Sequence, residues 1–366
     1  MDASKIVFRR RSTKPVRCGS VTIGGNSPIS IQTMTNTDTR DIQSTIRQIE
    51  ECVTAGADIV RVAIPDKKAA EALGTIKKNV SCPIVADIHF DYRLAILALK
   101  NGADKVRVNP GNIGGQARLL EVARIAKERG SALRIGINGG SLEKDILDRF
   151  GGPTPEAMVE SARRSLDLLE TNGIDGIVVS LKSSDVQNTI KSYSLLSRHT
   201  SWPFHVGITE AGPGLSGVIK SSAGIGSLLS LGLGETIRVS LTGSPVEEVQ
   251  VARSIIQAMG VGRFGPNLIS CPTCGRTQVN LVKVANEVAA RLGPIRVPLT
   301  VAVMGCPVNG PGEAREADVG LACGRDGGVL FSHGKIIRTV HEDQMVDALL
   351  ALVKEEVQRR GGQWCE

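Results

Sequence analysis

The feature of this 366-residue sequence that most constrains its fold is a short apolar run that recurs eight times. Each run is rich in Val, Ile and Leu, which is typical of strands buried on both faces of a parallel sheet. The eight expected strands are residues 29–35, 58–64, 83–89, 104–109, 133–138, 176–181, 204–209 and 236–241.

Amphipathic segments separate these runs. The clearest expected helices are residues 41–55, 92–101, 116–129, 155–172 and 245–259, and Gly56, Gly102 and Gly173 follow three of them as C-terminal caps. Eight strands and eight crossovers within about 240 residues predict a TIM barrel rather than an open Rossmann sheet. The dinucleotide motif Gly-x-Gly-x-x-Gly does not follow the first strand.

The pattern breaks at residues 260–266, and a different arrangement follows. A helix (281–292), a strand (297–303), a hairpin (329–332 and 335–340) and a last helix (342–360) are expected there. We therefore predict a barrel domain over residues 1–262 and a smaller α+β domain over residues 263–366.

Composition excludes several classes of protein. The net charge is +7, but 44 basic and 37 acidic residues are interspersed and only 3% are aromatic, which argues against nucleic-acid binding. No apolar run approaches the roughly 20 residues of a membrane span. Arg9–Arg11 resemble a twin-arginine signal, but no apolar segment follows them. We expect a cytoplasmic protein with reduced cysteines.

Charged residues interrupt the expected barrel strands. Because a charge facing the helix layer would be buried among aliphatic side chains, these residues are expected to point into the barrel, near its mouth. They are Arg61, Arg107, Arg134, Lys182 and Arg238, and Asn109, Asn138 and Ser240 share faces with them.

Two acids, Asp87 and Glu210, occupy equivalent positions. Five cations against two carboxylates favour a multiply charged anion, and the planar arginine fork suits phosphate oxygens. An interior balanced by its own ion pairs is the alternative. His89, at the end of a strand, is a candidate proton donor or a structural histidine.

A metal site is predicted from Cys271, Cys274 and Cys306, each beside proline or glycine. A turn of Asn-Gly-Pro-Gly would bring Glu313 back towards the same metal. Cys323 competes as a fourth ligand, which would make an all-cysteine zinc site. Three thiolates and a weak oxygen ligand would instead suit a 4Fe–4S cluster with an accessible iron. The four other cysteines are expected to be ordinary thiols: Cys18, Cys52, Cys82 and Cys365.

Several stretches resemble the 4-hydroxy-3-methylbut-2-enyl diphosphate synthase (IspG/GcpE) family in its bacterial two-domain form. They are residues 28–39 (PISIQTMTNTDT), 86–90 (ADIHF), 106–112 (VRVNPGN), 207–212 (GITEAG) and the two cysteine segments. The resemblance runs from about residue 10 to past residue 312.

This resemblance implies a reaction of the methylerythritol phosphate route to isoprenoids. The family reduces 2-C-methyl-D-erythritol 2,4-cyclodiphosphate by two electrons, opens its ring and releases water. Cys271, Cys274, Cys306 and Glu313 would hold one 4Fe–4S cluster per chain. Arg61, Arg107, Arg134, Lys182 and Arg238, with Asn138 and Ser240, would bind the diphosphate, and Glu210, Asp87 and His89 would serve catalysis.

The resemblance further implies a homodimer, in which the cluster domain of one subunit covers the barrel of the other. Flavodoxin or ferredoxin would supply the electrons. Two other functions stay open on the residues alone. One is a zinc-ribbon nucleic-acid binder fused to a barrel, and the other is a pterin-type barrel transferase that needs no cluster.

Overall fold

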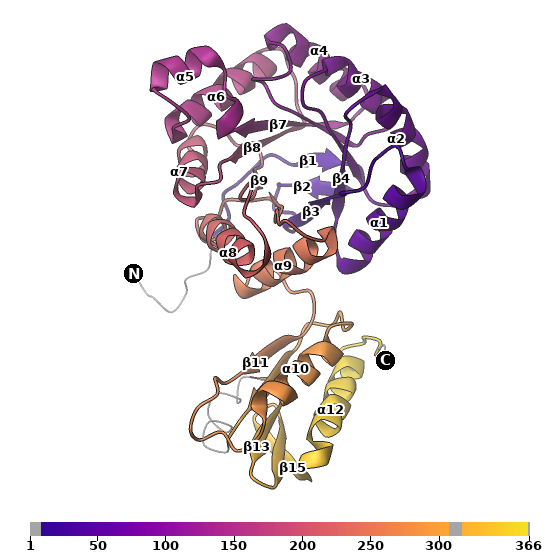
Figure 1. Ribbon diagram of the computed structural model, residues 1–366, viewed down its shortest axis with the longest axis vertical. Coiled ribbons are helices and arrows are strands. Elements are labelled where there is room, and N and C mark those ends of the chain that lie inside the picture. Colours follow the sequence, from indigo (N-terminus) through magenta and orange to yellow (C-terminus); the bar gives the residue numbers. More distant parts are fainter. Residues whose placement is uncertain (1–8, 307–316, 365–366) are drawn as a thin grey trace. The chain divides into compact units, whose positions relative to one another are not determined.

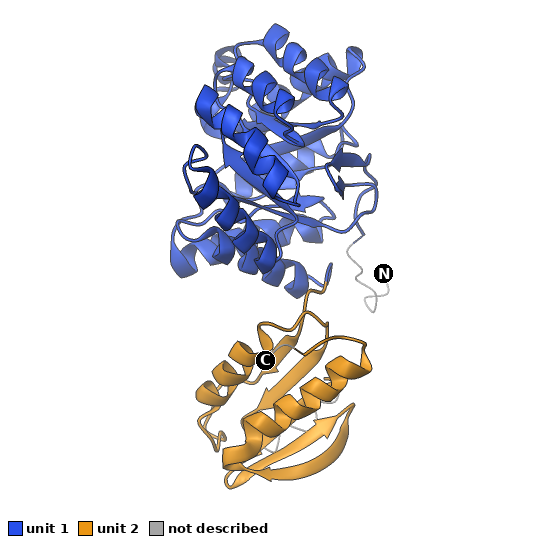
Figure 2. Ribbon diagram, turned by 90° about the vertical axis from the view of Figure 1, so that its right-hand side faces the viewer, with its two compact units in different colours: residues 1–262 blue, residues 263–366 orange. Residues whose placement is uncertain are grey.

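The computed structural model describes residues 9–306 and 317–364. The chain divides into two compact units, Met1–Gly262 and Arg263–Glu366, which Figure 2 colours separately. None of the helices in the described part of the chain has the length and apolarity that crossing a bilayer requires.

Eight parallel strands form the barrel of the first unit, which confirms the expected TIM barrel (Figure 1). They pair in the order β8-β7-β6-β5-β4-β3-β10-β9, and a bridge between Val179 and Phe204 joins the two ends. The strands are β3 (Ser30–Met34), β4 (Ile59–Ala63), β5 (Ile84–Asp87), β6 (Lys105–Val108), β7 (Ala132–Asn138), β8 (Ile177–Lys182), β9 (His205–Val206) and β10 (Thr236–Ile237).

The last two strands are much shorter than the sequence predicts. After β10 a side chain, rather than a neighbouring strand, is the hydrogen-bond partner of the backbone. The amide of Leu241 donates to Glu248 Oε1 at 2.9 Å. Side-chain contacts of this kind have no signature in the apolar pattern, which continues to residue 241.

Nine helices of the barrel unit alternate with or follow the strands in the described chain, and Figure 1 shows them around the barrel. Most begin at an Asp, Thr or Ser whose side chain accepts a first-turn amide, and Gly56 ends α1 in the left-handed conformation (φ 111°). They are α1 (Ile42–Ala55), α2 (Lys67–Asn79), α3 (Tyr92–Lys100), α4 (Gln116–Glu128), α5 (Lys144–Phe150), α6 (Pro155–Thr171), α7 (Val186–Leu196), α8 (Gly214–Ser230) and α9 (Pro245–Ala258).

A hairpin that the sequence did not reveal precedes the barrel. Its strands β1 (Val16–Cys18) and β2 (Val21–Ile23) pair antiparallel, and Cys18 is fully buried. Its turn at Gly19 lies against Asp104 and Pro83, which precede β6 and β5. The hairpin therefore lies at the amino-terminal end of these strands, opposite the mouth. Cys52 and Cys82 are buried as expected, and Cys365 is outside the described residues.

The barrel closes between β8 and β9 through a side chain. The hydroxyl of Tyr193, on α7, donates to the carbonyl of His205 at 2.6 Å and accepts from the amide of Leu181 at 3.0 Å. One phenol thus satisfies a backbone group on each strand. Tyr193 itself is fully buried.

The second unit is a five-stranded mixed sheet covered on one face by two helices. The sheet runs β11 (Asn267–Ser270), β12 (Thr300–Met304), β13 (Val319–Gly324), β14 (Gly327–Ser332) and β15 (Lys335–His341), and the helices are α10 (Leu281–Leu292) and α12 (Met345–Arg359). The expected hairpin and both expected helices are confirmed. Strands β11 and β13 were not foreseen.

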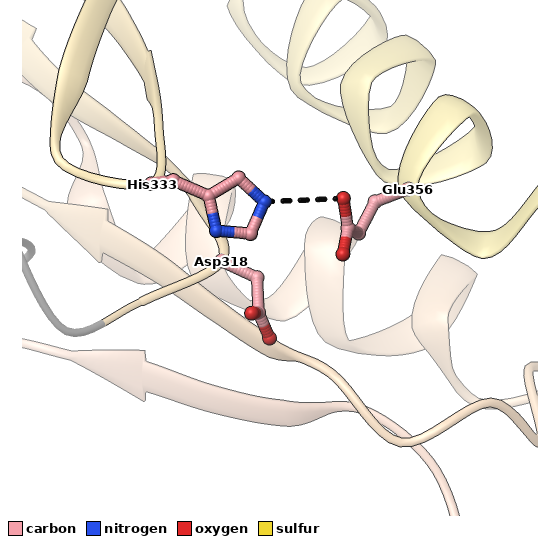
Figure 3. A group of neighbouring side chains, drawn as sticks. All are labelled: Asp318, His333 and Glu356. Atoms are coloured by element: carbon pink, nitrogen blue, oxygen red, sulfur yellow. Dashed lines mark hydrogen bonds and ion pairs between the residues drawn. The ribbon is translucent and has the colours of Figure 1, made fainter. Parts of the chain in front are cut away.

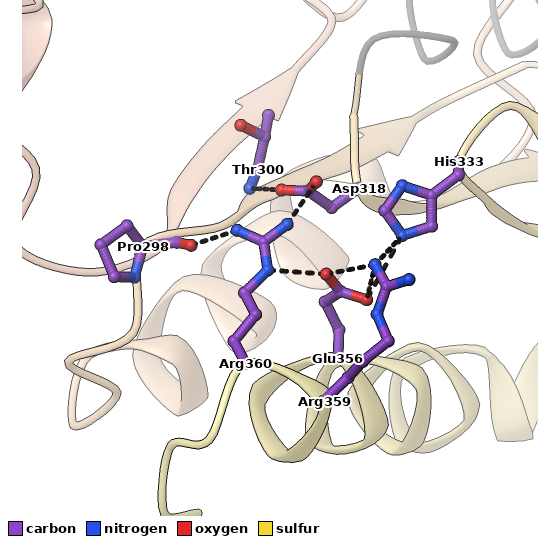
Figure 4. Close-up of polar contacts among 7 residues, drawn as sticks. All are labelled: Pro298, Thr300, Asp318, His333, Glu356, Arg359 and Arg360. Atoms are coloured by element: carbon purple, nitrogen blue, oxygen red, sulfur yellow. Dashed lines mark hydrogen bonds and ion pairs between the residues drawn. The ribbon is translucent and has the colours of Figure 1, made fainter.

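An ion-pair network fastens the end of α12 to this sheet (Figure 4). Glu356 is almost fully buried, and its carboxylate lies 2.8 Å from Arg359 Nη2 and 2.6 Å from Arg360 Nε. Arg360 also reaches Asp318 at 2.6 Å, and Asp318 accepts from the amide of Thr300 at 2.7 Å. Burial alone would raise the pKa of Glu356, but hydrogen bonds from Arg359, Arg360 and His333 lower it to about 2.

Tyr193→Phe should destabilise the barrel by about 1–3 kcal/mol, because it leaves two buried backbone groups without a partner. Thermal unfolding followed by circular dichroism measures this change. Tyr92→Phe, at a partly exposed position, is the matched control. Equal unfolding temperatures for the two variants would show that the phenol does not hold the seam.

Glu356→Gln should destabilise the second unit by about 1–3 kcal/mol at neutral pH. The folded-state pKa of Glu356 is depressed, so its contribution is fully present above its ordinary pKa of 4.5 and is lost as the pH falls towards about 2. The stability difference between wild type and variant should therefore shrink over that acid range. The neighbouring exposed Glu355→Gln should leave stability and its pH dependence unchanged.

Candidate active site

The charged strand residues do point into the barrel, as their alternation predicts. Arg107 on β6 lies in register with Arg134 on β7, and Asn138 lies in register with Lys182 on β8. Arg61, Arg107, Arg134 and Lys182 are all buried. Cations from several strands therefore share one interior.

Asp87 is the acid at the centre of this group. Its Oδ1 lies 3.7 Å from Arg61 Nη1 and 3.5 Å from Arg107 Nη1, and its Oδ2 lies 3.2 Å from His89 Nε2. Burial opposes the ionisation of Asp87, but Arg61, His89 and Arg107 hold its pKa well below the ordinary value. Asp87 is therefore a carboxylate that cannot serve as an acid in this state.

Arg107 is held by the backbone of the next strand. Its Nη2 donates to the carbonyl of Gly136 at 3.2 Å, and the amide oxygen of Asn138, oriented to suit its neighbours, accepts from the same Nη2 at 3.1 Å. A Cβ at position 136 would lie 2.4 Å from Arg107 Nε. Only glycine leaves room for the guanidinium here.

Three interior cations have no ion-pair partner within residues 9–306 and 317–364: Lys105, Arg134 and Lys182. Burial, together with neighbouring arginines, lowers the pKa values of Lys182 and Arg134 well below their ordinary values. Two guanidinium nitrogens of Arg134 have no hydrogen-bond partner in this part of the chain. Ion pairs thus form inside the barrel but leave several cations unpaired. The surplus positive charge favours the binding of an anion.

Sequence reasoning missed three interior residues. Lys105 and His205 are fully buried with side-chain nitrogens lacking partners among the described residues, and burial lowers the pKa of Lys105 to about 8. Strand alternation could have indicated both, because residues two apart in a strand share a face. Lys105 lies two residues before Arg107, and His205 lies two residues before Gly207. Glu248, whose Oε1 lies 3.6 Å from Arg238 Nη2, comes from helix α9 and carried no such signal.

Two predicted catalytic residues lie at the solvent-exposed edge of the barrel. His89 follows β5 and is exposed, although its ring contacts Asp87. Glu210 follows β9, is exposed, and has the left-handed backbone conformation (φ 52°) that is unusual for a residue other than glycine. Glu210 therefore does not balance the interior cations as expected. Ser240 is partly buried beyond β10.

The cysteine segments of the second unit are joined by hydrogen bonds through Gly305. Its amide donates to Cys271 Sγ at 3.2 Å, and its carbonyl accepts from the amide of Gln278 at 3.1 Å. A Cβ at Gly305 would lie 2.9 Å from the Cδ2 methyl of Leu281, so a larger residue here would have to move that side chain. Cys306 follows directly and is thereby held beside the Cys271–Cys274 loop.

The chemistry of these thiols fits an iron–sulfur cluster. Hydrogen bonds from the backbone of Arg276 lower the pKa of exposed Cys274, and an amide already points at Cys271 Sγ. Thiolates are the usual ligands of iron–sulfur clusters, and hydrogen bonds to their sulfurs tune the cluster.

Cys323 does not behave as a ligand. It is fully buried in the core beneath α10 and α12, and burial followed by the proximity of Cys271 raises its pKa to about 12. A thiol with a raised pKa binds metal poorly. Glu313 lies outside the described residues.

Asp318, His333 and Glu356 point toward one another and resemble a metal site (Figure 3). Arg359 and Arg360 already neutralise both carboxylates, as Figure 4 shows. A cation would have to displace two guanidinium groups. We therefore assign this cluster to the attachment of α12.

Lys182→Met should raise the unfolding temperature of the barrel while reducing binding of inorganic pyrophosphate, because removing an uncompensated buried charge gains about 1–3 kcal/mol. The folded-state pKa of Lys182 is depressed, so the unfolded chain binds more protons below pH 10.5 and wild-type stability rises with pH. The gain in the variant should accordingly be greatest at lower pH. Differential scanning calorimetry with the exposed Lys191→Met as control measures this, and a lower unfolding temperature for Lys182→Met would contradict it.

Comparison with known proteins bears on both units. Residues 13–253 match the model of the GcpE TIM-barrel domain, and residues 267–355 match that of the GcpE protein C-terminal domain. In structure, the type I 3-dehydroquinate dehydratase of Clostridium difficile covers 68% of this chain and 98% of its own, with a TM-score of 0.50 and 13% identity. That likeness reflects the barrel fold alone.

Curated relatives extend over nearly the whole chain. A protein of Caldanaerobacter subterraneus subsp. tengcongensis, described as 4-hydroxy-3-methylbut-2-en-1-yl diphosphate synthase (flavodoxin), is 54% identical over 355 residues, or 96% of this chain and 100% of that protein. One of Geobacter sulfurreducens with the same description is 54% identical over 346 residues, covering 94% and 98%. With both units matched to consecutive domains of one family, this chain belongs to the GcpE family.

Proposed function

We propose that this chain is a 4-hydroxy-3-methylbut-2-en-1-yl diphosphate synthase, an oxidoreductase of the methylerythritol phosphate route to isoprenoids. Its curated relatives at 54% identity carry that description. The observation that supports it most directly is the surplus of buried cations in the barrel, which suits a diphosphate. The match of both units to one family argues against the two alternative functions, a zinc-ribbon nucleic-acid binder and a pterin-type transferase.

The reaction takes up two electrons and one proton, and the phosphate oxygen released from the ring keeps a negative charge. The substrate, 2-C-methyl-D-erythritol 2,4-cyclodiphosphate, loses one ring C–O bond to phosphate and one hydroxyl, which leaves as water, and a carbon–carbon double bond forms. The product is the open allylic diphosphate. A 4Fe–4S cluster supplies the electrons and a Lewis-acidic iron when bound.

The barrel residues bind and orient the substrate in this proposal. Arginine forks and an ammonium group match the phosphate oxygens, and the low-dielectric interior strengthens each contact. The binding residues are Arg61, Arg107, Arg134, Asn138, Lys182, Arg238 and Ser240. The charge of the diphosphate would raise the pKa of Lys182 back towards its ordinary value and so stabilise its ammonium form.

Proton transfer is assigned to the mouth of the barrel. Asp87 stays ionised and orients His89 through the 3.2 Å contact, so that a protonated His89 can donate to the departing hydroxyl. Glu210 is the second acid–base candidate, because it is exposed and free to meet substrate. Its left-handed backbone conformation is a further mark of a functional position.

Cys271, Cys274, Cys306 and Glu313 are the proposed ligands of the cluster. Glu313 would be the weakest of the four ligands, because a carboxylate binds iron less firmly than a thiolate does. The relatives are described as flavodoxin-dependent, and we extend flavodoxin, with ferredoxin as the alternative donor, to this chain. A cytoplasmic homodimer completes the proposal.

Anaerobic purification followed by iron and sulfide analysis tests the function. We expect about four irons and four sulfides per chain, broad visible absorption, and turnover of the cyclic diphosphate with reduced flavodoxin. Cys271→Ala should lose the cluster and at least about a hundredfold of the activity, whereas Cys323→Ala should keep both. One zinc per chain, or full turnover by Cys271→Ala, would overturn the proposal.

A further inference from the structure

Glu248 is a buried acid whose placement the proposed chemistry does not explain. It lies in the first turn of α9 and is only 5% exposed. An ionised carboxylate is stable at such a position only where charged or hydrogen-bonding partners surround it. Its partners therefore indicate what it does.

Both carboxylate oxygens of Glu248 are fixed from the two strands that flank it. Oε2 accepts from the hydroxyl of Thr33, on β3, at 2.9 Å, and Oε1 accepts from the amide of Leu241 at 2.9 Å. With one hydrogen bond to each oxygen, the carboxylate cannot rotate. It is a fixed negative charge at the carboxyl ends of β3 and β10.

That fixed charge faces Arg238. Oε1 lies 3.6 Å from Arg238 Nη2, whereas Arg238 Nε has no hydrogen-bond partner in the described chain. Burial and the charge of Arg61 lower the pKa of Arg238 to about 10, and Glu248 opposes that shift. Nη2 and the unpartnered Nε lie on the same edge of the guanidinium, so the nearby carboxylate restricts how that group can turn.

We propose that Glu248 is a positioning residue for the diphosphate: it restricts the orientation of the Arg238 guanidinium, so that the remaining N–H groups of Arg238 bind the phosphate oxygens. The inference rests on the proposed function, since it takes the diphosphate as the ligand of Arg238. Glu248 itself does not touch substrate. It acts on affinity through Arg238, by limiting the orientations that binding would otherwise have to select.

A purely structural role is the competing explanation. Glu248 also links β3 to the segment after β10, so its loss could simply weaken the barrel seam. A structural defect would lower affinity whether or not Arg238 is present, whereas a positioning defect requires Arg238. A double-mutant cycle separates the two.

The experiment measures the dissociation constant of inorganic pyrophosphate, and separately KM and kcat for the cyclic diphosphate, with the full-length cluster-containing enzyme. The variants are Glu248→Gln, Arg238→Met and the double variant. We expect Glu248→Gln to weaken pyrophosphate binding about tenfold and to raise KM with kcat changed less than about twofold. In the Arg238→Met background the same substitution should change the dissociation constant less than about twofold.

Three further variants keep the test decisive. Glu247→Gln, on the neighbouring exposed acid, should bind as wild type. Thr33→Val removes one anchor of the carboxylate and should weaken binding less than Glu248→Gln does. Glu248→Asp, which keeps the charge, should recover part of the affinity and serves in place of Glu248→Gln if that variant does not fold.

Equal losses of affinity in the two Arg238 backgrounds would overturn the inference, as would wild-type affinity in Glu248→Gln. A wild-type enzyme that neither binds pyrophosphate nor turns over the cyclic diphosphate would overturn the proposed function as well. A wild-type enzyme that does both, with no coupling in the cycle, would remove only the role of Glu248.

Discussion

The barrel interior carries a positive charge that its own acidic residues do not neutralise. Asp87 binds two arginines and Glu248 a third, but Lys105, Arg134 and Lys182 stay without an ion-pair partner in the described chain. Like charges in a low-dielectric interior repel strongly, so folding must overcome this repulsion with apolar packing elsewhere. The aliphatic strands, the capped helices and the hairpin at the opposite end of the barrel supply that packing.

The two units divide the chemistry between different kinds of residue. Arginines on a rigid parallel barrel suit an anion whose oxygens must be held in place, because strand ends fix side chains better than loops do. The second unit offers thiols on two segments that meet where the amide of Gly305 donates to Cys271 Sγ. In the barrel, Gly136 makes room for the guanidinium of Arg107.

Most of the barrel was predictable because strands of a buried parallel sheet appear in the sequence as continuous apolar runs. The inward-facing arginines could be recognised because they interrupt these runs. Lys105 and His205 could have been found by the same alternation. What stayed hidden depends on contacts between distant segments. Glu248 reaches Arg238 from a helix, a side chain replaces a strand partner after β10, and the β1–β2 hairpin is too short to leave a pattern. The motif resemblance, rather than periodicity, linked these residues to one reaction.

The phenol of Tyr193 gives the barrel an unequal resistance to local opening. Other strand pairs are held by a backbone ladder, whereas β8 and β9 are joined by the bridge between Val179 and Phe204 and, beside Lys182, through one hydroxyl. Because the phenolic oxygen lies on the axis about which the ring rotates, the amide of Leu181 is released only when the whole Tyr193 side chain moves. Amide hydrogen exchange at Leu181 should thus follow side-chain motion, and the barrel can widen between Lys182 and the strand that leads to Glu210 while its other joints stay closed.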